Sequence, residues 1–126
     1  MTFDAMKPVH ELWVDYINAL RSTVQRVSAT HQHQLRDKVM RADLHGALIR
    51  VVRSRNATVV GTCGYVLVES KMAFQVVTRQ NAIRLIPKLH TVFDVYHPTA
   101  IFRFYGDHLL MRAAERSIRK FKSRKP

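Results

Sequence analysis

The first third of the chain has hydrophobic residues at helical spacing. Between residues 7 and 27 they recur every three or four positions, which is the period of one face of an α-helix, and Pro8 suits a first helical turn. Residues 28–33 show no period, and the spacing of Leu35 and Val39 predicts a short second helix over residues 34–41. Residues 1–43 are therefore expected to form an N-terminal helical segment. The hydrophobic stripe of the first helix consists of Leu12, Trp13, Tyr16, Ile17, Leu20, Val24 and Val27.

The middle of the chain, residues 44–111, has a different pattern. Its hydrophobic runs are short and rich in β-branched and aromatic residues, and turn-forming residues separate them, which is typical of antiparallel strands. Arginine alternates with apolar residues in Ile83-Arg84-Leu85 and Phe102-Arg103-Phe104, so these arginines are expected to point outward. About six such strands predict a small antiparallel barrel or sandwich. The runs cover residues 48–52, 65–69, 74–78, 83–86, 92–96 and 101–105.

The stretch VGTCGYV, residues 60–66, is open to four interpretations. A phosphate-binding loop needs a Lys and a Ser or Thr after its last glycine, and a following helix. A G-x-x-G clamp on a nucleic-acid backbone is typical of loops between helices. A nucleophilic Cys63 needs a nearby base and a lowered pKa. Strand-like sequence flanks the motif, which favours the fourth interpretation: Gly61 and Gly64 are bends or bulges, and Cys63 is a buried, inert thiol.

The net charge is more informative than any motif. The 126 residues, enough for one domain, include 21 Lys and Arg against 9 Asp and Glu, which gives a net charge of +12 and a pI near 10.7. A nucleic acid is the expected partner of such a chain, because neutralising phosphates releases their counterions. An anionic membrane surface is the alternative. Residues 112–126, expected to form a basic C-terminal helix and tail, have too few apolar residues for that role, and we expect no membrane association.

Signatures of catalysis and metal binding are weak. Asp43, Glu69, Asp94 and Asp107 are far apart in the sequence, and no catalytic motif includes them. The pair His31 and His33 has no other ligand at a spacing typical of metal sites. The sequence therefore predicts a non-catalytic chain that itself binds no metal or cofactor.

Several short motifs, taken together and in order, resemble one protein family. The first helix contains Leu12-Trp13-x-x-Tyr16, and the later motifs extend almost to the C-terminus. They are Ala42-Asp43-Leu44-His45-Gly46-Ala47, Val60-Gly61-x-x-Gly64-x-Val66, Glu69, Phe74, Ile86-Pro87-Lys88-Leu89, Tyr105-Gly106, Glu115-Arg116-Ser117 and Lys120-Phe121-Lys122. This set resembles the Sm-like-barrel protein subunit of archaeal and eukaryotic ribonuclease P, of the p-twenty-nine type, and the first helix is similar to the eukaryotic branch. Eukaryotic members usually carry a longer extension before this helix.

The resemblance implies a mainly β fold, a twisted six-stranded antiparallel Sm-like barrel with helices at both ends. It implies a non-catalytic, RNA-binding subunit of ribonuclease P and RNase MRP, located in the nucleus and nucleolus. In ribonuclease P the RNA removes the 5′ leader of precursor tRNA with magnesium. The implied protein partners are a zinc-ribbon subunit, which holds the zinc, and other ribonuclease P proteins. The alternative is an Sm-like or translation-related RNA-binding barrel outside ribonuclease P.

Two sets of residues are the candidate binding sites. For RNA, we expect a subset of the cations to line one face and contact phosphates, since the planar guanidinium of Arg can bind a phosphate through two hydrogen bonds; a dispersed, solvated set is the alternative. These cations are Arg50, Arg53, Arg55, Lys71, Arg79, Arg84, Lys88, Arg112, Arg116, Arg119, Lys120 and Lys122. For the zinc-ribbon subunit, the candidates are Leu12, Trp13, Tyr16, Ile17 and Leu20, unless this stripe packs on the barrel of its own chain.

Overall fold

The computed structural model describes residues 1–22 and 39–118, with side chains described for residues 1–20 and 39–115. All six predicted strands are present, and each is one or two residues longer than the hydrophobic run that predicted it. Their bounds are β1 Leu48–Ser54, β2 Cys63–Glu69, β3 Ala73–Thr78, β4 Ile83–Pro87, β5 Thr91–His97 and β6 Ala100–Tyr105.

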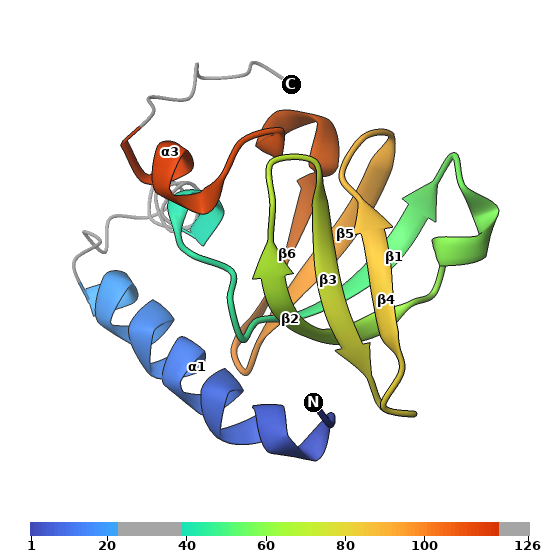
Figure 1. Cartoon of the computed structure of the whole chain (residues 1–126). Coiled ribbons are helices and arrows are strands. Elements are labelled where there is room, and N and C mark those ends of the chain that lie inside the picture. Colours follow the sequence, from blue (N-terminus) through green and yellow to red (C-terminus); the bar gives the residue numbers. More distant parts are fainter. Residues whose placement is uncertain (23–38, 119–126) are drawn as a thin grey trace.

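Helices precede and follow the sheet (Figure 1). The N-terminal helix begins where the sequence predicted, and its predicted last turn lies beyond the described residues. Of the expected helix over residues 34–41, residues 39–41 are helical and the others are outside the described part, as is the stretch 28–33. The helical elements are the 3-10 turns η1 Asp4–Met6, η2 Ala57–Val59 and η3 Gly106–Leu109, and the α-helices α1 Lys7–Ser22 and α3 Ala113–Ile118.

The six strands form one antiparallel sheet in the order β4-β3-β2-β1-β5-β6. The sheet curls into a barrel, as Figure 1 shows. Two irregularities interrupt its register, one in β1 between Val51 and Arg53 and one in β2 between Val66 and Val68. Bulges bend a strand and increase its twist, which helps a short sheet close on itself.

The core lies inside the curled sheet. Phe74 and Phe93 pack edge to face with ring centroids 5.2 Å apart, and the inward side chains of all the central strands surround them. Helix α1 closes one side of this core through Trp13 and Ile17, which belong to the same hydrophobic cluster. A second, smaller cluster lies on the outer side of the sheet, where Met6 covers Tyr65 and Val77. The N-terminal segment therefore contacts both sides of the barrel wall.

The glycines of the VGTCGYV stretch have structural roles. Gly61 has φ +85°, a conformation that glycine adopts without strain, in the turn that leads into β2. A Cβ atom at Gly64 would overlap the carbonyl oxygen of Val77 on the neighbouring β3. The structural interpretation of these glycines is confirmed, but neither is a bulge inside a strand: Gly61 lies in a turn before β2, Gly64 pairs in regular register, and the register shift of β2 lies between Val66 and Val68.

Candidate nucleic-acid interface

A row of charged residues crosses the outer face of the sheet. Arg50 on β1 lies opposite Cys63 on β2 and opposite Asp94 on β5, and Asp94 in turn lies opposite Arg103 on β6. Directly opposed residues of neighbouring strands share a face of the sheet. This lateral row therefore brings Arg50 and Arg103 to one surface from opposite sides of Asp94.

The bulge in β1 adds Arg53 to the same face. In a regular strand Arg50 and Arg53 would point to opposite faces, because side chains alternate. The register shifts by one residue between Val51 and Arg53, so that Arg53 lies opposite Val92, which shares its face with Asp94. Arg53 and, just beyond the strand, Arg55 are both exposed. An irregularity of the backbone thus aligns two arginines that alternation would separate.

Arg79 extends the row at its other end. Arg79 directly follows Thr78, the last residue of β3, and Thr78 lies opposite Gly64 on the antiparallel strand β2. The residue before Gly64 is Cys63, so Arg79 lies beside Cys63. Burial raises the pKa of the half-buried Cys63 thiol above its ordinary value, and the charges of Arg50 and Arg79 oppose this shift. Cys63 is therefore less buried than the sequence predicted, but its raised pKa is the reverse of what a nucleophile requires. We define the basic row as Arg50, Arg53, Arg79 and Arg103.

Arg103 was not among the predicted RNA-binding residues. Its Nε donates a hydrogen bond to Asp94 Oδ1 at 2.9 Å and a second nitrogen donates to Oδ2 at 3.2 Å. Hydrogen bonding to Asp94 raises the pKa of the guanidinium, which stays half-exposed. The alternation of Phe102-Arg103-Phe104 indicated that Arg103 points outward; only the strand order shows which residues lie beside it. Among the described residues, no carboxylate is within ion-pair distance of Arg50, Arg53, Arg55 or Arg79.

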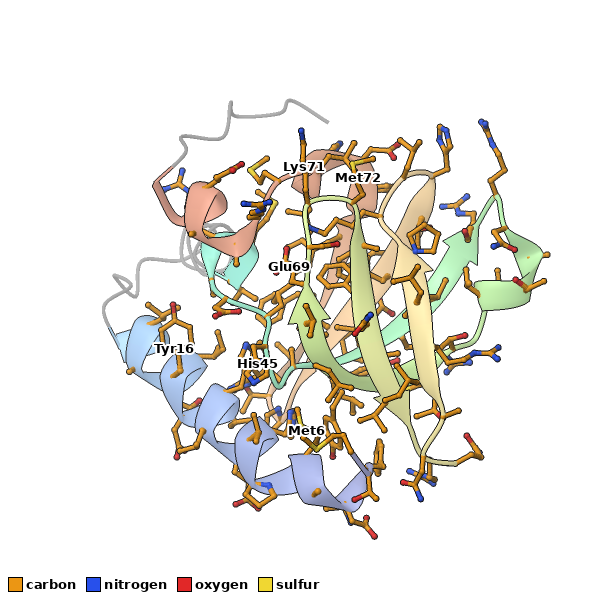
Figure 2. The ribbon with its side chains drawn as sticks, viewed as in Figure 1. Met6, Tyr16, His45, Glu69, Lys71 and Met72 are labelled. Atoms are coloured by element: carbon orange, nitrogen blue, oxygen red, sulfur yellow. The ribbon has the colours of Figure 1, made fainter. Side chains whose placement is uncertain are left out.

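Other predicted cations are separate from the basic row. Lys71 is exposed in the turn between β2 and β3, at the opposite end of β3 from Arg79 (Figure 2). The expectation that Arg84 points to the outer face is wrong: it lies opposite the core residue Val76 on the core-facing side of β4, where it is exposed because β4 is an edge strand, and its neighbours Ile83 and Leu85 are exposed on the other face. Arg112 is exposed just before α3. The side chain of Arg116 and all of Arg119, Lys120 and Lys122 are outside the described part of the chain.

The prediction that Lys88 contacts RNA is wrong. Its side chain is fully buried, and its Nζ donates hydrogen bonds to Glu69 Oε2 at 2.8 Å and to the carbonyl oxygens of Leu109 at 2.8 Å and Met111 at 2.9 Å. These bonds join the end of β2, the residue after β4 and the segment after β6. An amine enclosed in this way cannot reach a phosphate. Nothing in its local sequence distinguishes Lys88 from an exposed lysine.

The proposed docking stripe on α1 needs a similar correction. Trp13 and Ile17 are 3% and 1% exposed, and the indole nitrogen of Trp13 donates a hydrogen bond to the carbonyl of Asp43 at 2.9 Å. Leu20 also packs against this core. These three side chains cover the barrel of their own chain. Leu12 and Tyr16, one helical turn apart, stay 68% and 44% exposed on the adjacent strip of the helix.

Two features are absent from the described part of the chain. No group of three or more His, Cys, Asp or Glu side chains there is arranged to hold a metal ion. No helix there is both long and apolar enough to span a bilayer.

Comparison with known protein families identifies the family to which the chain belongs. The family model described as Ribonuclease P/MRP, subunit p29, matches residues 37–119, which include the whole sheet and helix α3. The chain belongs to this family. The resemblance seen in the sequence motifs is thereby confirmed.

Individual members of the p29 family agree with this assignment. The chain is 38% identical over 117 residues to mouse ribonuclease P protein subunit p29, which covers 93% of this chain and 52% of the mouse protein. It is 30% identical over 126 residues to the probable ribonuclease P protein subunit 1 of Schizosaccharomyces pombe, covering 97% of this chain and 55% of that protein. The RNases MRP/P 32.9 kDa subunit of Saccharomyces cerevisiae is 33% identical over 125 residues, covering 91% and 45%. The chain spans about half the length of these relatives.

A solved structure is also similar. The structure of Mth11, titled as a homologue of human RNase P protein Rpp29, shares 24% identity with a TM-score of 0.46, covering 58% of this chain and 95% of that one.

Many residues of the motifs that carry the resemblance to the p29 family have structural roles in this chain. Asp43 Oδ1 accepts a hydrogen bond from the backbone N–H of His45 at 2.9 Å, and His45 Nδ1 lies 2.8 Å from the carbonyl oxygen of Leu67. Glu69 and Lys88 form the buried ion pair. These motif residues thus identify the family through contacts that stabilise its fold, and no residue of the basic row belongs to any of the motifs.

Proposed function

We propose that this chain is an RNA-binding protein subunit of ribonuclease P, and of RNase MRP where that particle exists. In this proposal it supports 5′ maturation of tRNA precursors by binding and stabilising the RNA of the particle, and it acts in the nucleus and nucleolus. Membership of the p29 family supports the particle, because the related proteins are named as its subunits.

The basic row is the single observation that supports RNA as the ligand. Arg50, Arg53 and Arg79 share one exposed face, and no described carboxylate is within ion-pair distance of them. A net charge of +12 adds long-range attraction for a polyanion. Guanidinium groups bind phosphate oxygens in pairs of hydrogen bonds, so this face suits the backbone of an RNA helix or strand.

We place the catalytic step in the RNA rather than in this chain. The carboxylates that a nuclease would use as metal ligands or as general acid and base have structural partners here. Asp94 binds Arg103, Glu69 binds Lys88, and Asp107 accepts a hydrogen bond from the backbone N–H of His90 at 2.6 Å. In this proposal magnesium acts with the RNA, and zinc belongs to a partner subunit.

The exposed strip on α1 is the proposed contact for that zinc-ribbon subunit. Leu12 and Tyr16 together present an apolar and an aromatic side chain to solvent on a helix whose other apolar face is already buried. Aromatic residues are common anchors at the centre of protein interfaces. The docking surface is accordingly smaller than the whole stripe.

Recovery of bound RNA from cells tests the function. The chain is expressed with an affinity tag in cells of its source organism, and co-purified RNA is sequenced. We expect the RNA of ribonuclease P, and that of RNase MRP, to be strongly enriched over a tagged Arg50→Gln/Arg53→Gln variant. Recovery of ribosomal or messenger RNA alone would favour a barrel that acts outside these particles. The purified chain without RNA should not cleave precursor tRNA, with or without magnesium.

The docking surface is tested by a matched pair of variants. Leu12→Ala/Tyr16→Ala should weaken co-purification of the zinc-ribbon subunit and leave the unfolding temperature of the isolated chain nearly unchanged. Trp13→Ala should instead lower the stability by roughly 3–5 kcal/mol, since it removes a buried aromatic side chain. Full retention of the partner by the Leu12/Tyr16 variant would exclude this strip.

A further inference from the structure

A cleft lies where the N-terminal segment meets the outer face of the sheet. Its volume is about 390 Å³, and it is lined by residues of η1, α1, β1, β2 and the turn between β3 and β4. Small-molecule sites begin at about 300 Å³, so the cleft has room for one nucleotide but not for a helix. The lining residues are Phe3, Asp4, Lys7, Leu48, Tyr65, Arg79 and Asn81.

One wall of the cleft is aromatic and held in place. The ring of Phe3 stacks on Tyr65 with centroids 4.4 Å apart, and the backbone N–H of Phe3 donates a hydrogen bond to Asn81 Oδ1 at 2.9 Å. Tyr65 is itself buried between Phe3 and His10, whose ring centroid lies 5.0 Å away. Phe3 is thus fixed through both its ring and its backbone. A wall that is ordered before a ligand arrives reduces the entropy lost on binding.

The rim of the cleft is cationic. The guanidinium carbon of Arg79 lies over the Phe3 ring, 6.0 Å from its centroid, and the Arg79 side chain is exposed. Lys7 also lines the cleft, where it forms an ion pair with Asp4 at 3.2 Å. Arg79 is therefore the cation that remains available to an anion. An aromatic ring with an exposed arginine over it suits the two halves of a nucleotide, since bases stack on aromatic rings and the guanidinium binds phosphate.

The cleft is continuous with the basic row. Arg79 belongs to both, and Leu48 on the cleft wall is two residues from Arg50 on the same strand and the same face. An RNA strand that follows Arg53, Arg50 and Arg79 would therefore reach the mouth of the cleft. This continuity favours RNA over a peptide as the occupant.

We propose that this cleft binds a single unpaired nucleotide of the RNA, with its base against the Phe3 wall and a phosphate at Arg79. The inference rests on the proposed RNA-binding function and adds to it a preference for unpaired RNA. The chain would distinguish a single-stranded or bulged segment from a continuous duplex, because only an unpaired base can enter. The RNA-binding surface would then include Phe3 at the very start of the chain, which no charge pattern indicates.

The test compares two RNA probes on the full chain. Fluorescence anisotropy measures the Kd for a ten-nucleotide oligouridine and for a twelve-base-pair RNA duplex. Stacking of a base contributes roughly 1–3 kcal/mol, so Phe3→Leu and Phe3→Ala should weaken oligouridine binding by at least about fivefold. Duplex binding should change less than about twofold. Arg53→Gln, which lies outside the cleft, should weaken both.

Crosslinking makes the test independent of whether the variants fold. Oligouridine with one 4-thiouridine is irradiated with the unaltered chain, and the attached peptides are identified by mass spectrometry. Crosslinks at residues 3–7 or 65 support the proposal. Unchanged oligouridine affinity in folded Phe3 variants, or crosslinks confined to other segments, would overturn it. If the unaltered chain binds neither probe, the proposed RNA-binding function itself fails, which is a different result.

Discussion

Lys88 and Arg50 carry the same charge in one small barrel, but their environments are opposite. The Lys88 amine is enclosed by one carboxylate and two carbonyl oxygens, whereas Arg50 stands on an open face with Arg53 and Arg79 nearby. A buried charge needs a complete set of partners, because desolvation costs several kcal/mol per ion. An exposed arginine needs none, so it stays available to phosphate. The comparison shows that the same charge stabilises the fold in one region and suits binding in another.

Replacing Lys88 should have the largest effect. Lys88→Met removes the cation that Lys88 places beside the buried Glu69 carboxylate, together with its hydrogen bonds to two carbonyl oxygens, and it should reduce the free energy of unfolding by about 3–5 kcal/mol. Urea unfolding followed by circular dichroism measures this change. Lys71→Met removes the same charge from an exposed turn and should change stability by less than about 0.5 kcal/mol.

A double variant sharpens the result. Lys88→Met combined with Glu69→Leu removes both charges, and it should recover part of the lost stability, because an apolar pair can replace a buried ion pair. If Lys88→Met unfolds at the same urea concentration as the unaltered chain, the buried anchor has no energetic role and the comparison is wrong.

Removing charge from the exposed face should have an intermediate effect, on binding rather than on stability. Arg50→Gln/Arg53→Gln should weaken RNA binding by roughly tenfold near physiological salt. The slope of log K against log salt should become shallower by roughly 1.4–1.8, since each lost phosphate contact contributes about 0.7–0.9. Titrations at four or more salt concentrations measure both quantities.

The matched control removes two cations from elsewhere on the barrel. Lys71→Gln/Arg84→Gln makes the same change in net charge, but these residues lie apart from the basic row. We expect a clearly smaller change of slope. Equal slopes for the two double variants would mean that RNA responds to total charge, and that the row is not a defined interface.

The smallest expected effect is on the reactivity of Cys63. Its pKa is raised by burial, so its thiolate should form, and react with iodoacetamide, only at higher pH than in the unfolded chain. Because the Cys63 thiol has a higher pKa in the folded chain than in the unfolded chain, it stabilises the folded state at pH values below the unfolded-state pKa. This stabilisation is lost as the pH rises through the folded-state pKa. Mass spectrometry of the alkylated protein over a pH series gives the rate profile.

Substitutions in the basic row should shift that profile. Arg50→Gln or Arg79→Gln removes a charge that lowers the thiol pKa, so alkylation should slow further at a given pH. Arg84→Gln should leave the profile unchanged. An identical profile in all three variants would show that Arg50 and Arg79 do not converge on Cys63.

The six strands were predictable because each is a short β-branched or aromatic run between turn-forming residues, and local pattern dominates in such segments. The glycines of VGTCGYV were also predictable, since strand-like neighbours left little other use for them. The stripe on α1 was predicted only as one unit. Whether Trp13 or Leu12 is buried depends on which side of the helix faces the barrel, and spacing alone does not determine that orientation.

The sequence by itself determined the net charge, the six strands, the amphipathic first helix and, through its motifs, the family. Each of these depends on neighbours along the chain or on composition.

Only the tertiary structure decided which cations are buried with partners and which face solvent. Lys88 is buried because Glu69, Leu109 and Met111, 19 to 23 residues away, converge on its amine. Arg53 joins Arg50 because a bulge in β1 reverses the alternation of side chains, and the aromatic cleft exists because the chain's third residue folds back onto Tyr65. Long-range contacts of this kind bring together residues that are distant in the sequence, so no local pattern records them.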